Sequence, residues 1–337
     1  MATRRARTRG VPVIPETMKA AAVDRFGPPE ALTLHTLPVP EPGPRQVLIA
    51  VHAAGVGVWD AAIRDGSWQP AGRARFPLIP GIDGAGIVAS TGARVRRPAV
   101  GDRVYALEIS NPQGGFYAEY VAVDAEHAAP VPRRLDMREA AAAVTTGLTA
   151  LQGIDDTLRL RSGETVLIFG ASGAVGTLAV QFAKRRRARV IGTATGRAAT
   201  ALVRRLGADA VFDARARNAA DRLRELAPDG LDAVLALAGG DELERCLDLV
   251  RRGGRIAYPN GIDPEPRRRR GIRIVPYDGV PGRQQFARLE RAVAEARLRV
   301  PIAAVYPLAQ AAKAHARLER GQVLGRIVLE VRRGRAR

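Results

Sequence analysis

The segment VLIFGASGAVGTLAVQFAK, residues 166 to 184, joins a buried strand to an amphipathic helix. The strand, TVLIF at 165–169, is apolar throughout, as expected when helices cover both faces of a sheet. The residues after it place apolar side chains at i, i+3, i+4, i+7 and i+8, which is the stripe of a helix packed against that sheet. These side chains are Val175, Leu178, Ala179, Phe182 and Ala183.

Three glycines, Gly170, Gly173 and Gly176, lie where the strand turns into the helix. Residues without a Cβ permit a tight turn, let the backbone approach a ligand and let the helix lie close to the strand. The first helical turn also presents unpaired N–H groups and the positive end of the helix dipole, which both suit a pyrophosphate. The G-x-x-G-x-x-G spacing departs from the G-x-G-x-x-G fingerprint, so a tight turn without a ligand is the alternative. The order of strand, turn, helix and second strand favours dinucleotide binding.

The second strand indicates which dinucleotide would bind. An NAD-binding unit carries an acidic residue about 20 positions further on, which accepts hydrogen bonds from the adenosine ribose. The segment ARVIGTATGRAAT, residues 188 to 200, contains no Asp or Glu, and Ala194 stands where a carboxylate is expected. Thr193, Thr195 and Arg197 surround it, and hydroxyls and a guanidinium would bind a 2′-phosphate that a carboxylate would repel. The sequence therefore predicts NADPH as the cofactor, with a solvated helix-start position as the alternative for Arg197.

The composition is that of an ordinary soluble protein. The chain has 337 residues, of which 46% are hydrophobic and 26% charged, and it is long enough for two domains. No apolar run reaches the roughly 18 residues of a membrane span, so we expect no membrane association and a cytoplasmic location. The single cysteine, Cys246, excludes a disulfide within the chain and a cysteine-based metal lobe.

A net charge of +19 raises the possibility of nucleic-acid binding. Most of the surplus lies in two terminal groups and one internal block, and no aromatic residue is interleaved with them. This distribution favours solvated tails and a loop over a nucleic-acid site. The arginines concerned are Arg4, Arg5, Arg7, Arg9, Arg267 to Arg270, Arg332, Arg333, Arg335 and Arg337.

Strand and helix candidates alternate through the second half of the chain, which predicts an α/β fold with a doubly wound parallel sheet. The strand candidates are 165–169, 189–193, 209–213, 232–236 and 254–258. The helix candidates lie near 174–185, 197–206, 217–226 and 241–251. The first half consists instead of short strands punctuated by glycine, and the closing GRIVLEV is a strand that can return to that β-rich part.

With these residues in view, the chain from about Met18 to Val331 resembles the medium-chain dehydrogenase/reductase superfamily, in its zinc-free quinone oxidoreductase-like branch. The likeness lies in an ordered series of motifs: MKAAAVDRFGPPEALTL, AAGVGVWDAAIRDG, PLIPGIDGAGIV, GDRVYAL, GGFYAEYVAV, EAAAAVTTGLTA and GRIVLEV. It implies a GroES-like β-rich catalytic domain, a Rossmann nucleotide-binding domain and commonly a homodimer. We expect a disordered basic extension at 1–17, the catalytic domain at 18–135 plus 297–337, and the Rossmann domain at 136–296.

The resemblance also implies roles for particular residues. Thr149 would lie beside the nicotinamide, and Gly239 and Asn260 would border the ribose and nicotinamide. The candidates for the substrate pocket are Trp59 and Asp60, with core packing and loop bracing as their respective alternatives. Backbone N–H groups for the pyrophosphate would come from Gly173, Ala174 and Val175.

Zinc ligands of the related dehydrogenases are missing from the matching positions, which read GVGVWD and GID. The histidines, His35, His52, His127 and His315, are scattered singly. We therefore expect no metal, and a reductase that delivers hydride from NADPH to a quinone or an α,β-unsaturated carbonyl, with solvent as the default proton donor. An enoyl-thioester reductase, with Arg267 to Arg270 on a ligand phosphate, is one alternative. A nucleic-acid-binding or redox-sensing protein on the same fold is another.

Overall fold

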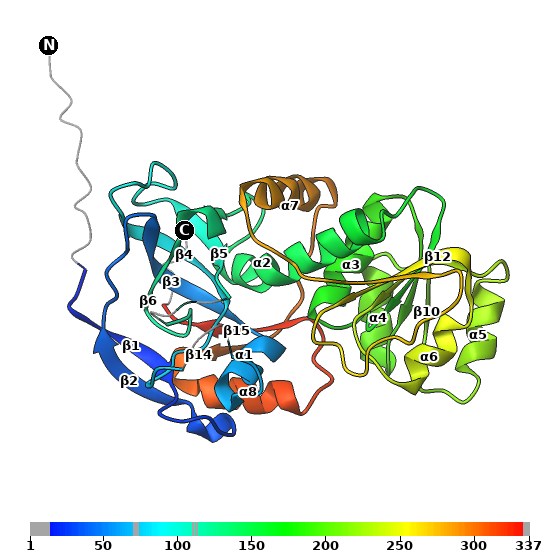
Figure 1. Cartoon of the computed structure of the whole chain (residues 1–337), viewed down its shortest axis with the longest axis horizontal. Helices are drawn as coiled ribbons and strands as arrows, with labels where there is room; N and C mark the ends of the chain where they lie inside the picture. Colours follow the sequence, from blue (N-terminus) through cyan, green and yellow to red (C-terminus); the bar gives the residue numbers. More distant parts are fainter. Residues whose placement is uncertain (1–13, 70–73, 110, 112–113, 333–337) are drawn as a thin grey trace, which may run out of the picture.

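The computed structural model describes residues 14–69, 74–109, 111 and 114–332. Three sheets organise this part of the chain, and Figure 1 shows the two larger ones at opposite ends of the long axis. The predicted basic extension falls almost wholly on residues 1–13, which lie outside the described residues. The predicted α/β class, with a β-rich half and a doubly wound parallel sheet, is confirmed.

The β-rich half is built on a seven-stranded sheet of order β14-β15-β3-β4-β5-β7, with β6 paired to β3, and on a separate β1-β2 pair. The last strand, β15, pairs antiparallel with β3, so GRIVLEV returns to this sheet as expected. The strands are β1 (Thr17–Ala22), β2 (Thr33–Pro38), β3 (Gln46–Val56), β4 (Asp83–Thr91), β5 (Arg103–Leu107), β6 (Tyr120–Asp124), β7 (Ala128–Pro130), β14 (Ile302–Pro307) and β15 (Arg326–Glu330). The helices are η1 (Pro29–Ala31), α1 (Val58–Asp65), η2 (Ala125–His127), η4 (Leu308–Gln310) and α8 (Ala311–Glu319).

The other half holds a six-stranded sheet of order β10-β9-β8-β11-β12-β13, in which every neighbouring pair is parallel. Its strands are β8 (Thr165–Phe169), β9 (Arg189–Thr193), β10 (Ala210–Phe212), β11 (Leu231–Ala236), β12 (Val250–Pro259) and β13 (Arg273–Tyr277). Its helices are α3 (Ala174–Arg185), α4 (Arg197–Arg205), α5 (Ala219–Leu226) and α6 (Asp241–Leu247). All six strands end at one edge, which is where parallel sheets bind ligands.

Two details of this sheet differ from the expectation. The helix expected near 241–251 ends at Leu247, because Val250 already starts β12 beside Leu231 of β11. A sixth strand, β13, follows the arginine block and forms one edge of the sheet, opposite β10.

The chain passes between the halves through α2 (Met137–Gln152) and α7 (Arg283–Glu295), with the π-helix η3 (Gly153–Thr157) after α2. Twelve of the sixteen residues of α2 are buried, so this alanine-rich helix packs on all sides as a shared core element. Among the described residues, no helix is long and apolar enough to cross a membrane. The domain bounds expected near 136 and 296 stay a prediction.

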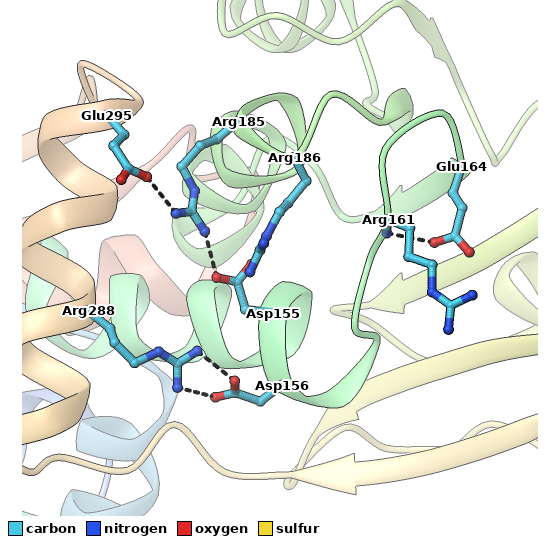
Figure 2. A network of polar contacts seen from close by, with 8 residues as sticks. All are labelled: Asp155, Asp156, Arg161, Glu164, Arg185, Arg186, Arg288 and Glu295. Atoms are coloured by element: carbon cyan, nitrogen blue, oxygen red, sulfur yellow. Dashed lines mark hydrogen bonds and ion pairs between the residues drawn. The ribbon is translucent and has the colours of Figure 1, made fainter.

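Ion pairs hold α7 against α3 and η3, as Figure 2 shows. Asp155 of η3, whose side chain is 6% exposed, accepts from Arg185 at 2.5 Å and from Arg186 at 2.7 Å. Arg185 also contacts Glu295 of α7 at 2.8 Å, and Arg288 of α7 pairs with Asp156 at 2.6 Å. The network therefore fixes the helix that carries the chain back to the β-rich half.

Candidate functional site

The glycine turn between β8 and α3 has the close packing that its sequence predicts. Gly170 adopts a φ of +87°, a left-handed conformation that favours glycine. A Cβ on Gly176 would lie 2.2 Å from the carbonyl oxygen of Gly170, so only glycine lets the helix begin this close to the strand. Gly173 differs, because its φ is −76° and a Cβ there would meet nothing nearer than that same oxygen, at 3.5 Å. The fold alone therefore does not require a glycine at 173.

The start of α3 presents backbone donors. The first bond of the helical ladder runs from the N–H of Thr177 to the carbonyl of Gly173, at 2.9 Å. Of the donors expected for the pyrophosphate, the N–H of Gly173 already bonds the carbonyl of Gly170 at 3.2 Å, and Gly173 forms a parallel bridge with Gly325. The N–H groups of Ala174, Val175 and Gly176 follow it and come before the helical ladder begins. Three amides at the positive end of a helix form a cradle that fits a pyrophosphate.

Thr193, at the end of β9, supports this turn. Its hydroxyl oxygen accepts from the N–H of Gly170 at 2.8 Å, and its carbonyl accepts from the N–H of Ala171 at 3.2 Å. The side chain is buried. Thr193 thus fixes the position of the turn, whereas Thr195 and Arg197 are exposed beyond it.

A surface cavity of about 460 Å³, open to solvent, lies beside the end of β9, between α4 and β10. Arg197, Thr200 and Arg204 of α4 line one side of it. Asp213, the residue after β10, lines the other side and accepts from the Thr195 hydroxyl at 3.0 Å. The segment 188–200 contains no acid, yet the fold brings one next to it. The rule that ligands bind at the carboxyl ends of parallel strands would have drawn attention to Asp213.

The remaining residues expected near the coenzyme lie at the same edge of the sheet. Gly239 follows β11, and a Cβ there would lie 2.2 Å from the carbonyl oxygen of Pro264. Asn260 follows β12 and donates its side-chain amide to Asp278, which follows β13, at 2.8 Å. Their relation to a bound nicotinamide stays a prediction.

Thr149 lies in α2 beneath the loop that follows β13. Its carbonyl accepts from the Tyr277 hydroxyl at 3.0 Å, and a Cβ on Gly279 would lie 2.4 Å from its hydroxyl oxygen. The side-chain amide of Gln152 donates to the carbonyl of Val280 at 2.9 Å and holds the loop down. Thr149 is 8% exposed and therefore faces this loop.

Trp59 and Asp60, adjacent in α1, have different environments. Trp59 meets Trp68 edge to face, with ring centroids 5.3 Å apart, and its ring also lies against Gly261 at the end of β12. It therefore spans the space between the two halves. Asp60 is fully buried and accepts from the N–H groups of Gly57 at 2.7 Å and Ile82 at 3.0 Å. These two bonds brace the loop before α1. Loop bracing is the alternative to a substrate-pocket role that the sequence left open for Asp60.

A second carboxylate lies close to Asp60. Burial, and then the nearby Asp83 carboxylate, raise the pKa of Asp60 to about 7, while Arg326 opposes the shift. Arg326 donates to Asp83 at 3.0 Å and 3.2 Å, beneath the backbone of Gly57. The residue before it, Gly325, donates its N–H to the carbonyl of Ser172 at 3.0 Å. The start of β15, together with the preceding residue, thus contacts both the loop before α1 and the glycine turn.

The described residues contain no group of three or more His, Cys, Asp or Glu side chains placed to hold a metal ion. Cys246 is buried in α6, and His127 pairs with Glu108 at 2.9 Å. His315 is fully buried between Tyr117 and Arg64, and burial lowers its pKa to about 3.

Two of the arginines expected to be solvated have partners. Arg269 contacts Glu244 at 2.8 Å and Asp248 at 3.0 Å, which ties the arginine block to α6. The Arg332 guanidinium lies 4.3 Å from the centroid of the Tyr120 ring. The expectation of solvated tails and a loop was therefore wrong for these two residues.

Family models match two parts of the chain. One, described as an alcohol dehydrogenase GroES-like domain, matches residues 43–133, and one described as a zinc-binding dehydrogenase matches residues 206–329. The quinone oxidoreductase of Mus musculus is 34% identical over 312 residues, which cover 88% of this chain and 93% of the relative. Its human counterpart is 31% identical over 326 residues, which cover 93% and 97%.

Solved structures agree with these matches. The crystal structure of an NAD-dependent alcohol dehydrogenase superimposes with a TM-score of 0.85 at 31% identity and covers 94% of this chain and 100% of its own. The structure of mycobacterial Rv1454c complexed with NADPH gives 0.81 at 28% identity, covering 93% and 100%.

Proposed function

The chain belongs to the medium-chain dehydrogenase/reductase superfamily, in its quinone oxidoreductase-like branch, and from this premise we propose an NADPH-dependent, zinc-independent reductase of quinones or α,β-unsaturated carbonyls. The observation that carries the proposal is the cradle of three amides at the start of α3, beside a cavity with two arginines. When bound, the coenzyme supplies the hydride, and the protein orients it and stabilises developing charge.

The residues around the glycine turn and beside the end of β9 have separate roles in binding the coenzyme. The N–H groups of residues 174–176 hold the pyrophosphate, and Arg197 holds the 2′-phosphate. Both coenzymes appear among the neighbouring structures, since mycobacterial Rv1454c is complexed with NADPH and the alcohol dehydrogenase is described as NAD-dependent. Trp59, which lies against the loop after Asn260, supplies an apolar wall suited to a flat, conjugated substrate.

Within the part of the chain that the structure describes, no set of side-chain donors fits zinc. A catalytic zinc site takes three Cys, His or carboxylate ligands. The chain has one cysteine, which is buried in α6, and His127 and His315 are hydrogen-bonded to Glu108 and Tyr117. We therefore assign zinc no part in the reaction.

Asp60 is not the proton donor in this proposal. Both of its carboxylate oxygens accept backbone N–H groups, and the side chain is fully buried. Solvent supplies the proton to the anion that hydride transfer leaves, which is an enolate from an enone or a hydroquinone anion from a quinone. For the enoyl-thioester alternative, Arg269 is already paired with Glu244 and Asp248, which reduces the positive charge that the block offers to a ligand phosphate.

A homodimer is also part of the proposal. β13 is one of the two outer strands of the six-stranded sheet, and Ile274 and Val275 on it are half-buried. An outer strand offers unpaired backbone groups to a second copy. Light scattering coupled to size exclusion measures the mass in solution, and a monomer would contradict this part of the proposal.

The cytoplasmic location stays a prediction of the sequence.

The test follows NADPH oxidation with a panel of quinones, enones and enoyl thioesters, and with NADH as the control donor. We expect turnover of quinones or enones, faster with NADPH than with NADH. If calorimetry detects no binding of either coenzyme, the proposed function is wrong. Turnover of enoyl thioesters alone would favour the enoyl-thioester reductase instead.

A further inference from the structure

The cavity beside β9 contains an acid that the β9 segment itself lacks. Strand β10 pairs with β9 in parallel, with Phe212 opposite Thr193, so the next residue, Asp213, reaches the end of β9. The Thr195 hydroxyl donates its only proton to Oδ1 of Asp213 at 3.0 Å. Thr195 therefore presents lone pairs to the cavity, and an ionised Asp213 likewise only accepts. This side of the cavity matches a hydroxyl donor and repels a phosphate.

The opposite side of the cavity is positively charged. Residues 197, 200, 201 and 204 of α4 line the cavity at the i, i+3, i+4, i+7 spacing of one helix face. Two of them are arginines, Arg197 and Arg204, and both are exposed. Among the described residues, neither guanidinium has a hydrogen-bond or ion-pair partner. Two guanidiniums against one carboxylate leave a formal surplus of one positive charge.

We propose that this cavity accepts the adenosine ribose of both coenzyme forms, and that Asp213 sets the preference between them. The inference deepens the proposed function and rests on it. Asp213 and Thr195 accept from the 2′-hydroxyl of NADH, while Arg197 and Arg204 bind the 2′-phosphate of NADPH. The surplus positive charge makes NADPH bind more tightly than NADH. The Asp213 carboxylate reduces the difference between the two affinities.

Asp213 also has a local structural role, which the test must separate from its charge. Its Oδ1 accepts from the N–H of Arg215 at 3.0 Å, a bond typical of an Asp that closes a turn. Asn in its place keeps an Oδ1 that accepts from both Arg215 and Thr195. The Asp213→Asn variant therefore removes the charge and preserves these two contacts.

Binding is measured through energy transfer from tryptophan to the reduced nicotinamide. The chain has two tryptophans, Trp59 and Trp68, which contact one another, and the Trp59 ring lies against Gly261. Dissociation constants for NADPH and NADH are compared for the unaltered protein, Asp213→Asn and Arg204→Gln, with Asp221→Asn as the control. Asp221 lies in α5, and its side chain is 75% exposed and pairs only with Arg224 of the same helix.

In Asp213→Asn we expect NADPH to bind about three- to tenfold more tightly and NADH about threefold more weakly, since one charge beside a partly exposed phosphate has an effect of this order. Arg204→Gln, at an exposed helix position, weakens NADPH alone by about threefold. The control leaves both constants unchanged. An NADPH-to-NADH ratio that stays within about twofold in Asp213→Asn, or a loss of both coenzymes alike in Arg204→Gln, overturns the inference. If the unaltered protein binds neither coenzyme, the proposed function itself has failed.

Discussion

Replacing Gly173 by alanine should separate coenzyme binding from folding. The φ of −76° suits any residue, and the added Cβ meets its nearest atom at an ordinary 3.5 Å. Alanine is a poorer N-cap than glycine by roughly 0.5 kcal/mol, but it lowers the entropy of the unfolded chain by a similar amount. The free energy of unfolding should therefore change by less than about 0.5 kcal/mol.

Coenzyme binding should change much more, because the new methyl group stands where the pyrophosphate approaches the amides of residues 174–176. One hydrogen bond to a charged group contributes about 1.5–3 kcal/mol, so its loss weakens NADPH by roughly 10- to 100-fold. Calorimetric titration with NADPH and urea unfolding give the two quantities.

Gly176→Ala is the matched comparison. Its Cβ would lie 2.2 Å from the Gly170 carbonyl oxygen, so the backbone must shift, at a cost of about 1–3 kcal/mol in stability. That variant should lose both stability and binding. If Gly173→Ala binds NADPH as tightly as the unaltered protein, the amides at the start of α3 do not face the pyrophosphate and the reasoning fails.

Three further predictions concern single side chains. The folded state raises the pKa of Asp60 from 3.8 to about 7, so it holds a proton that the unfolded chain releases, and stability falls as the pH rises from about 4 to 7. Asp60→Asn should flatten that slope in urea unfolding, and an unchanged slope would contradict the assignment. Asp155→Asn, which removes the charge shared by two arginines at a site 6% exposed, should lower the free energy of unfolding by about 2–3 kcal/mol, against less than about 0.5 kcal/mol for Asp221→Asn, 75% exposed. Trp59→Ala should raise the KM for a small quinone roughly tenfold through the lost apolar wall, and steady-state kinetics with no change in KM would remove Trp59 from the pocket.

The parallel sheet was predictable because local pattern and global fold agree there. The strand at 165–169 and the helix at 174–185 match β8 and α3 in both bounds. The pattern was misleading where apolar residues run from a helix into the next strand without a break. Leu249 and Val250 continue the periodicity of α6, yet pairing with β11 makes Val250 the first residue of β12.

The candidate site was predictable only in part, because some of its charged residues are brought together from segments that are far apart in the sequence. No property of the segment 188–200 signals Asp213, which reaches Thr195 through the pairing of β10 with β9. Arg269 is similar, since its acidic partners lie in α6 and directly after it, earlier in the chain. The backbone requirements of Gly170 and Gly176 are local, and the sequence alone sufficed for them.

The contact of Gly325 with the glycine turn has a consequence for synthesis. The carbonyl of Ser172 receives its partner, and Asp83 its guanidinium, from residues within the last thirteen of the chain. The β-rich half is thus begun early in synthesis and completed late, because β3 pairs with β15, which is translated after the whole nucleotide-binding sheet. A chain that stops before residue 325 would therefore carry a complete nucleotide-binding sheet beside a β-rich half in which β3 lacks its partner β15.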